Sequence, residues 1–241
     1  MERGMNTKIN CDSKLEAIRI QCVRGDQKVF TEIDFCLKSS DALLLKGPNG
    51  SGKSSLLRIL SGLLRCSDGE LYWAGNSVYK DIDTYRRSIH FVGHLDGIKP
   101  TLTVREHLEF WATLRGVKNS VPRLIEKFGL LNLTDVTGRF LSAGQKRRVS
   151  LARLVFSDAP LWLLDEPTVT LDSEAINVLE EAISKHRSAG GIVVVASHTD
   201  IKMDDARVIN MQSHTPKYLT GESRKRNIEK IENPYGTWSE W

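Results

Sequence analysis

The sequence predicts an α/β fold with a mostly parallel core sheet, and three observations support this prediction. Apolar stretches with strand character alternate with amphipathic helical stretches, which is the pattern of a doubly wound sheet. Residues 161–164 are solidly apolar, as expected for a strand at the centre of a parallel sheet. One predicted strand leads into one predicted helix through a glycine-rich stretch, which reads Gly47-Pro48-Asn49-Gly50-Ser51-Gly52-Lys53-Ser54.

The expected elements follow from apolar periodicity, since alternation predicts strands and helical spacing predicts helices. In chain order, the expected strands cover residues 15–23, 33–37, 42–46, 71–73, 88–92, 161–164, 192–196 and 207–211. The expected helices cover residues 55–64, 81–87, 103–127 (broken at Gly116 and Pro122), 141–157 and 173–188. A tight turn is expected at residues 67–69, between short strands.

The alternation of strands and helices is interrupted by a region of helices alone. This predicts an inserted helical lobe from about residue 95 to residue 158. We expect one domain over residues 15–211 that includes this lobe. Residues 1–14 and 212–241 are polar, the second with a basic cluster at 224–226, so we expect both ends to be flexible.

The composition is that of a globular chain and bounds the possible functions. Of the 241 residues, 40% are hydrophobic and 27% are charged, and the net charge of +4 is too small to indicate nucleic-acid binding by itself. No apolar run is long enough to cross a bilayer, and residues 1–14 lack the apolar core of a signal peptide. The cysteines lack the C-x-x-C spacing of metal or redox sites, which indicates reduced, intracellular cysteines; they are Cys11, Cys22, Cys36 and Cys66. We therefore expect the chain to reach a membrane only through a partner.

The glycine-rich stretch matches the P-loop pattern G-x-x-x-x-G-K-[ST] at every fixed position. The strand before it and the helix after it aim backbone N–H groups at one point, and the glycines let a phosphate approach the backbone closely. We expect residues 47–54 and Ser55 to bind a triphosphate, with Lys53 on its β- and γ-phosphates and Ser54 on Mg²⁺. The alternative is an ordinary glycine-rich turn, which the flanking strand and helix disfavour.

An acidic pair, Asp165-Glu166, follows the apolar strand at 161–164. Ligands bind at the carboxyl ends of the strands of a parallel sheet, so we expect Asp165 beside the P-loop, where it would hold Mg²⁺ together with Ser54. We expect Glu166 to act as general base on a water in line with the γ-phosphate, which contributes roughly 10²–10⁴-fold in rate. The alternative is a solvated acidic pair at the end of a strand.

A second helix start is found at Leu141-Ser142-Ala143-Gly144-Gln145. Ser142 and Gln145 have the spacing of a capping box, S-x-x-Q, which accounts for them as the start of a well-capped helix. A serine and a glycine at a helix start also suit a phosphate. Because this helix and the P-loop helix belong to different lobes, one chain cannot easily grip a nucleotide with both. Two copies placed head to tail could, which predicts a two-fold dimer with the nucleotide at its interface.

Together these motifs resemble the ordered motif set of the ATP-binding cassette (ABC) ATPases, over residues 15–211. The set consists of the P-loop, L-S-A-G-Q, an apolar strand that ends in D-E-P, an L-D pair, and a lone histidine after a strand. The resemblance implies ATP and Mg²⁺ as ligands, a nucleotide-sandwich dimer, and an antiparallel β subdomain at the N-terminus. It also implies that Ser142, Gly144 and Gln145 form a signature loop. Asp172 would be a carboxylate that acts across the dimer, and His198 a histidine that contacts the γ-phosphate.

Within this family the chain is similar to the haem-exporter ATPases of cytochrome c maturation. The similarity lies in residues 93–103, 141–154 and 190–194, and in the compact size. It implies an ATPase subunit that passes energy to multi-span membrane subunits through the surface of residues 95–114, for haem export or for haem release from a haem chaperone. The implied place is the cytoplasmic face of the bacterial inner membrane, or the matrix side of the mitochondrial inner membrane. The sequence has no C-x-x-C-H motif, so we expect no direct haem site on the chain itself.

Other functions are compatible with parts of this pattern. One is the ATPase subunit of another small-molecule ABC transporter. A soluble ABC ATPase that acts on DNA or ribosomes typically has two cassettes or a long coiled coil, whereas this sequence has one cassette and no heptad run. A plain P-loop kinase would lack the signature loop, and its Glu166 would need no partner chain. We therefore expect no direct contact with nucleic acid.

Two positions depart from the general ABC pattern. His94 occupies the place of a glutamine that usually serves the metal and the attacking water, and the haem-exporter relatives resemble this chain there. A neutral imidazole can accept only one hydrogen bond. The aromatic residue that usually stacks on adenine is missing near Arg24, so either the Arg24 guanidinium stacks on the base or Phe30 moves in.

Overall fold

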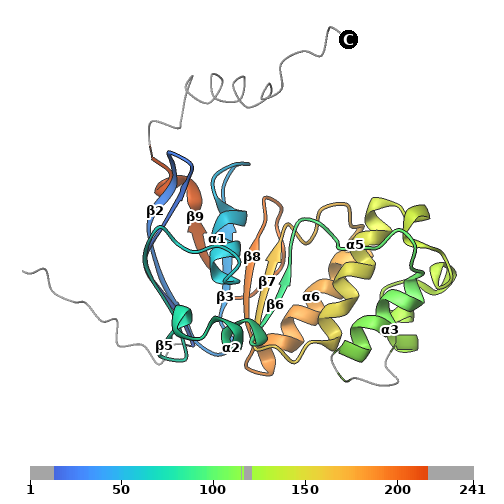
Figure 1. The fold of residues 1–241 in the computed structure, drawn as a ribbon. Helices are drawn as coiled ribbons and strands as arrows, with labels where there is room; N and C mark the ends of the chain where they lie inside the picture. The colour runs from blue at the N-terminus through green and yellow to red at the C-terminus, as the bar shows by residue number, and fades with distance from the viewer. Residues whose placement is uncertain (1–13, 115, 117–120, 217–241) are drawn as a thin grey trace, which may run out of the picture.

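The computed structural model describes residues 14–114, 116 and 121–216. Its central element is a five-stranded sheet in the order β6-β7-β8-β3-β9, in which every neighbouring pair is parallel (Figure 1). The strands are β3 (Ala42–Lys46), β6 (Ile89–Val92), β7 (Leu161–Asp165), β8 (Ile192–Ala196) and β9 (Arg207–Asn210). All residues of β7 and β8 are buried, because both faces of the sheet are covered. The predicted α/β fold with a mostly parallel core sheet is confirmed.

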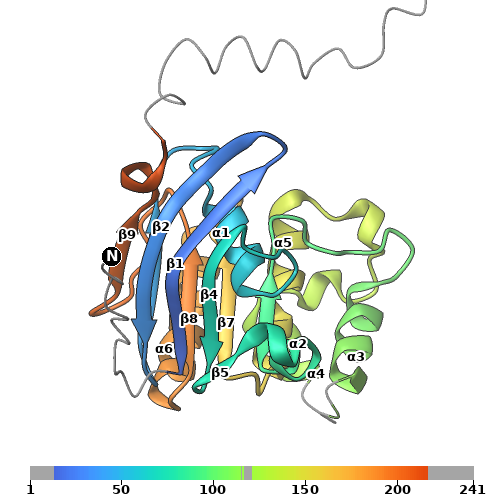
Figure 2. The same cartoon turned by 60° about the vertical axis from the view of Figure 1, so that its left-hand side comes forward.

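A second sheet is antiparallel and covers one face of the core (Figure 2). Its order is β2-β1-β4-β5, and its strands are β1 (Leu15–Arg24), β2 (Gln27–Leu37), β4 (Asp68–Trp73) and β5 (Asn76–Ser77). This confirms the antiparallel β subdomain at the N-terminal end of the fold.

The prediction of a tight turn at residues 67–69 is wrong. Asp68 and Gly69 belong to β4, which pairs with β1. The chain reverses instead at Ala74-Gly75, between β4 and β5, where φ is 48° and 76°. Two successive residues with positive φ suit the twist of a two-residue hairpin turn, and glycine adopts this conformation without steric cost.

The inserted helical lobe is confirmed, since α3, α4 and α5 gather beyond one edge of the parallel sheet (Figure 1). The α-helices are α1 (Lys53–Leu60), α2 (Ile82–Arg87), α3 (Val104–Leu114), α4 (Val121–Lys127), α5 (Ala143–Ala152) and α6 (Ser173–Ser188). The short 3₁₀ helices are η1 (Val78–Lys80), η2 (Leu131–Leu133), η3 (Gly138–Phe140), η4 (Arg153–Phe156) and η5 (Met211–His214).

Some helix boundaries differ from those expected. α1 ends at Leu60 because Gly62, with a φ of 70°, takes the left-handed conformation that stops a helix. The stretch expected as one helix over 141–157 is α5 followed by the tighter η4. Pro122 lies in the first turn of α4 rather than outside it, because the N–H that proline lacks would have no partner inside the helix at that position.

Two apolar clusters hold the sheets and helices together. Successive side chains of β7 point to opposite faces of the sheet, so Leu161 and Leu163 join one cluster while Trp162 and Leu164 join the other. The first cluster lies among the two sheets and α1, and the second lies among the parallel sheet, the helical lobe and α6. With both faces buried, the carboxyl-terminal edge of the parallel sheet is the place where polar loops meet.

The two ends of the chain lie largely outside the described residues, which exclude 1–13 and 217–241. The flexible ends expected at 1–14 and 212–241 therefore stay predictions. Within the described part, the chain continues past residue 211 into η5, whose Met211 is fully buried in the first cluster. No helix in that part is both long and apolar enough to cross a membrane.

Candidate nucleotide-binding site

The P-loop joins β3 to α1 and closes into a tight loop that only glycine permits at two positions. Gly47 has a φ of 148°, and a Cβ placed on it would lie 2.7 Å from Ser51 Oγ. Gly52 has a φ of 98°, and a Cβ there would lie 2.7 Å from the Phe30 ring. Because α1 begins at Lys53, the free N–H groups of its first turn face this loop, which makes it an anion site.

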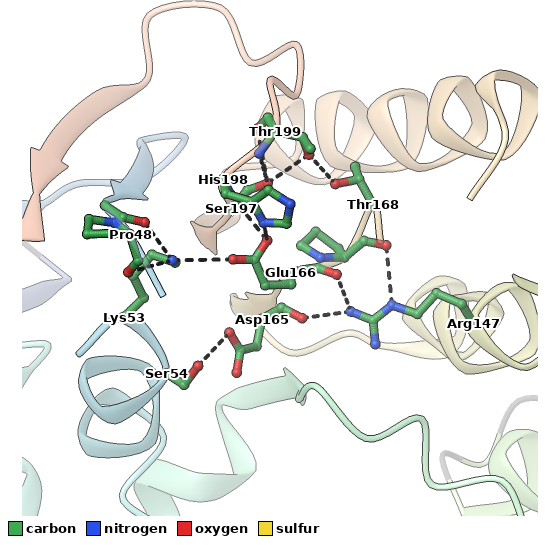
Figure 3. A network of polar contacts seen from close by, with 12 residues as sticks. Pro48, Lys53, Ser54, Arg147, Asp165, Glu166, Thr168, Ser197, His198 and Thr199 are labelled. Atoms are coloured by element: carbon green, nitrogen blue, oxygen red, sulfur yellow. Dashed lines mark hydrogen bonds and ion pairs between the residues drawn. The ribbon is translucent and has the colours of Figure 1, made fainter. Parts of the chain in front are cut away.

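Lys53 fills the inside of the loop. Its side chain is 6% exposed, and Nζ donates a hydrogen bond to the Gly47 carbonyl oxygen over 2.8 Å. The same Nζ lies 3.4 Å from Glu166 Oε1 (Figure 3). A carbonyl and a carboxylate thus hold the ammonium group inside the P-loop, where it could contact a bound phosphate.

Ser54 and Asp165 meet beside the lysine, although 111 positions separate them in the chain. Ser54 Oγ donates to Asp165 Oδ1 over 3.0 Å. Burial raises the pKa of Asp165, and its closeness to Glu166 does too, while the Ser54 hydrogen bond, His94 and Arg147 oppose the shift. A hydroxyl and a carboxylate are hard oxygen ligands, and one or two such ligands next to a phosphate site fit Mg²⁺. The described residues contain no cluster of three His, Cys, Asp or Glu side chains that could hold a metal by themselves.

Glu166 lies in a strained backbone conformation and has several hydrogen-bond partners. Its φ is 47°, a left-handed conformation that costs about 1–3 kcal/mol for a residue other than glycine. Its N–H donates to the Ala196 carbonyl oxygen of β8 over 2.8 Å. Its Oε2 accepts from the His198 N–H over 3.2 Å and lies 2.8 Å from His198 Nδ1. The carboxylate is therefore held between Lys53 and His198 (Figure 3).

The residues predicted as a signature loop form a separate cluster. Ser142 caps α5 as expected: its Oγ accepts from the Gln145 N–H over 3.2 Å, and its own N–H donates to Gln145 Oε1 over 2.8 Å. Gly144 packs so closely that an added Cβ would lie 2.6 Å from the Thr170 carbonyl oxygen. Asp172 caps α6 through the Ala175 N–H.

These residues line a cavity of about 490 Å³, and no P-loop residue belongs to its lining. Its lining is made of Gly129, Leu133, Ser142, Gly144, Gln145, Arg148, Thr170, Leu171 and Asp172. Asp172 also forms an ion pair with Arg148 in this cavity. The predicted site residues are thus brought together in two groups, one around Lys53 and one around Ser142, and the structure of one chain does not join them.

Two further predicted residues lie at the margins. His94 is exposed in the loop after β6 and is near enough to Asp165 to affect its pKa. Arg24 is exposed at the end of β1. Phe30 is fully buried against the P-loop, so the alternative in which it moves in to stack on the base is disfavoured.

Arg147 is a further residue of this site, and the motifs of the sequence did not single it out. Its side chain is 4% exposed and reaches the backbone next to Glu166. The signal that would have found it is its spacing, because Arg147 shares the buried face of α5 with Ser150 and Leu151. A charged residue on a buried helix face must have partners.

Comparisons with known proteins agree with this geometry. Residues 30–169 match the ABC transporter family. The cytochrome c biogenesis ATP-binding export protein CcmA of Rhodospirillum rubrum is 51% identical over 196 residues, which cover 81% of this chain and 84% of that protein. ABC transporter I family member 1 of Arabidopsis thaliana is 36% identical, over 83% of this chain and 89% of that protein.

Solved structures share the fold. The structure named putative ABC transporter (ATP-binding protein) of Pyrococcus furiosus matches 85% of this chain and all of its own length, with a TM-score of 0.72 and 26% identity. A dimeric ATP-binding cassette in a post-hydrolysis state, bound to ADP and Pi, matches 77% of this chain and 88% of its own, with a TM-score of 0.64 and 25% identity. The chain therefore belongs to the ABC transporter family, among the cytochrome c biogenesis ATP-binding export proteins.

Proposed function

We propose that the chain is the ATP-hydrolysing subunit of an ABC transporter complex for c-type cytochrome biogenesis, in which hydrolysis drives haem export or haem release from a haem chaperone. The observation that carries the proposal is the placement of the Glu166 carboxylate between Lys53 and His198, beside the Ser54–Asp165 pair. The names of the similar proteins support the biological role.

Each side chain of the first group has a distinct role. The N–H groups of residues 47–54 and Ser55 bind the phosphates, and Lys53 neutralises the β- and γ-phosphates. Ser54 and Asp165 would hold Mg²⁺, which would neutralise charge on the phosphate oxygens. Glu166 accepts the proton of the attacking water, and His198 orients that carboxylate and contacts the γ-phosphate.

The second group acts on the nucleotide of a second copy of the chain. Ser142, Gly144 and Gln145 present the start of α5, and Asp172 lies beside them in a cavity apart from the P-loop. A two-fold dimer would place this group of one chain over the P-loop of the other. Dimeric cassettes among the similar structures support this arrangement.

The remaining roles complete the proposal. Arg24 would stack on the base, and His94 would serve the metal and the attacking water in place of the usual glutamine. The surface of residues 95–114 contacts multi-span membrane subunits, and three of its apolar side chains are well exposed: Leu95 at 85%, Phe110 at 51% and Leu114 at 66%. Haem is handled by these partners. The chain then works at the cytoplasmic face of the bacterial inner membrane or the matrix side of the mitochondrial one.

The catalytic part is tested with the purified full chain and its Glu166→Gln variant. The wild-type chain should hydrolyse ATP with Mg²⁺ and lose this activity in EDTA. The variant should still bind ATP but hydrolyse it roughly 10²–10⁴-fold more slowly, and light scattering should show a trapped dimer with ATP. A matched control is Glu181→Gln, which removes an exposed carboxylate paired with Lys127. Unimpaired hydrolysis by Glu166→Gln, or a monomer with ATP, would refute the assignment.

The membrane part is tested separately by pull-down of the tagged full chain from detergent extracts. Multi-span membrane proteins should be recovered, and a Leu95→Asp, Leu114→Asp double variant should recover fewer of them. Recovery of rRNA or DNA instead would exclude the transporter role while leaving ATP hydrolysis intact.

A further inference from the structure

We infer that Arg147 is a positioning residue of the hydrolysis site, which ties the surface loop after β6 to the backbone that carries Glu166. The side chain comes from α5 in the helical lobe and is 4% exposed. It reaches both the end of β7 and the loop that follows β6. One guanidinium therefore connects three parts of the fold that are far apart in the chain.

At one end, the guanidinium binds three successive carbonyl groups. Nη2 donates to the carbonyl oxygens of Asp165 over 2.7 Å and Glu166 over 2.8 Å, and Nε donates to that of Pro167 over 3.3 Å. These carbonyls belong to the peptide groups around Glu166, whose φ of 47° needs support from its surroundings. In Figure 3, Lys53 and Arg147 approach this segment from opposite sides. The peptide orientation that Arg147 holds determines where the Glu166 carboxylate points.

At the other end, Arg147 holds the loop after β6. Nη1 donates to the Gly93 carbonyl oxygen over 2.9 Å and to Asp96 Oδ1 over 3.0 Å. Between these two acceptors, Leu95 is 85% exposed and belongs to the surface proposed to contact the membrane subunits. A shift of this loop would be carried to the Glu166 backbone through the rigid, planar guanidinium.

This inference rests on the proposed function, since it takes Glu166 as the proton acceptor. It adds a named route by which a partner seated at Leu95 changes the rate of hydrolysis. The route needs arginine, because its fork of N–H groups reaches acceptors in several directions. Lysine places all of its donors on one atom and cannot serve Asp96 and the carbonyls of residues 165–167 together.

The test compares Arg147→Lys, Asp96→Asn and Asp96→Glu in the full chain, with Glu181→Gln as the control. Arg147→Lys should lower kcat about 10- to 100-fold while the KM for Mg-ATP changes less than about threefold, because misplacement of the catalytic group by up to 1 Å costs up to this much. Asp96→Asn should lower kcat about three- to tenfold, since a neutral amide accepts a weaker bond, and Asp96→Glu should recover most of the loss. Glu181→Gln should behave as the wild type.

A second readout separates positioning from a general loss of structure. In a Glu166→Gln background the carboxylate is absent, so adding Arg147→Lys should change the residual single-turnover rate less than about twofold. A merely structural role would lower both backgrounds equally. If Arg147→Lys does not fold, the contrast between Asp96→Asn and Asp96→Glu decides the question.

The outcomes distinguish the two claims. Wild-type kcat in both Arg147→Lys and Asp96→Asn, or a loss confined to KM, would refute the positioning role alone. A wild-type chain without Mg-dependent ATP hydrolysis would refute the proposed function itself.

Discussion

Gly144→Ala is a small change that should disable the composite site without unfolding the protein. The added Cβ would lie 2.6 Å from the Thr170 carbonyl oxygen. The two must separate by about 0.4 Å to reach 3.0 Å, the closest real contact, and by about 0.8 Å to reach ordinary contact at 3.4 Å. The Thr170 carbonyl oxygen belongs to the backbone, and the new Cβ is fixed directly to the backbone of Gly144, so neither can turn aside and the start of α5 moves away from the segment that carries Asp172.

The size of the effect follows from this displacement. A misplacement of up to 1 Å in a catalytic constellation costs up to about 10²-fold in rate, so we expect kcat to fall about 10- to 100-fold, or about 1.4–2.7 kcal/mol in the barrier. Stability should change little, because alanine is favoured over glycine in a helix by about 1 kcal/mol and offsets part of the strain.

The assay measures ATP hydrolysis, ATP-dependent dimerisation by light scattering, and ATP affinity at a protein concentration too low for dimers. The first two should fall, while the affinity of the P-loop for ATP should change less than about twofold, since Gly144 lines a cavity that contains no P-loop residue. The control is Glu181→Gln, which removes an exposed carboxylate paired with Lys127 and belongs to neither group of site residues. Wild-type turnover and dimerisation in Gly144→Ala would refute the reasoning.

Three other predictions concern the first group of site residues and the stability of the fold. Lys53→Ala should lower ATP turnover by about 10²–10³-fold, since it removes the cation inside the P-loop; retained turnover in a coupled-enzyme assay would exclude that role. Asp165→Asn should abolish Mg-dependent turnover but leave the Tm, measured without nucleotide, at least as high as in the wild type. The reason is that burial raises the pKa of Asp165, so its charge opposes folding at pH 7. A clearly lower Tm would contradict this. The Tm should also fall as the pH drops below about 6.5, since burial lowers the pKa of His186 below its ordinary value of 6.5 and the unfolded chain takes up the proton first. His186→Phe, which keeps an aromatic ring stacked on Trp162, should flatten this dependence, and an unchanged pH slope would assign it to other groups.

The P-loop and the central strand could be predicted from the sequence because their signals are local. Fixed spacing within eight residues and an unbroken apolar run each depend on neighbours in the chain. The parallel sheet then brings the end of β7 to the P-loop, which is why Ser54 and Asp165 were expected together across 111 positions. The contact between Ser54 and Asp165 could thus be predicted from the fold class, although no local pattern indicates it.

Other features depend on contacts that no local pattern reveals. The turn at residues 67–69 was wrong because β4 begins there and pairs with β1, a partner more than forty residues earlier. Arg147 was missed because its hydrogen-bond acceptors come from two other segments of the chain. Its neighbours in the sequence are also basic, and a run of basic residues usually lies on an exposed helix face. The sequence left open whether Arg24 or Phe30 meets the base, because the burial of Phe30 beneath Gly52 depends on the packing of two separate elements.

The most direct measurement mixes two inactive variants. Lys53→Ala has a disabled P-loop and an intact signature loop, and Gly144→Ala has the reverse. If each site is built from two chains, then at a protein concentration at which both variants are dimeric, half of the dimers in an equal mixture are mixed and each holds one intact site, so turnover should rise to about one quarter of the wild-type rate. Two results together would contradict the composite site. The mixture would show only the average turnover of the two separate variants, and the wild type would be active at concentrations where it is a monomer.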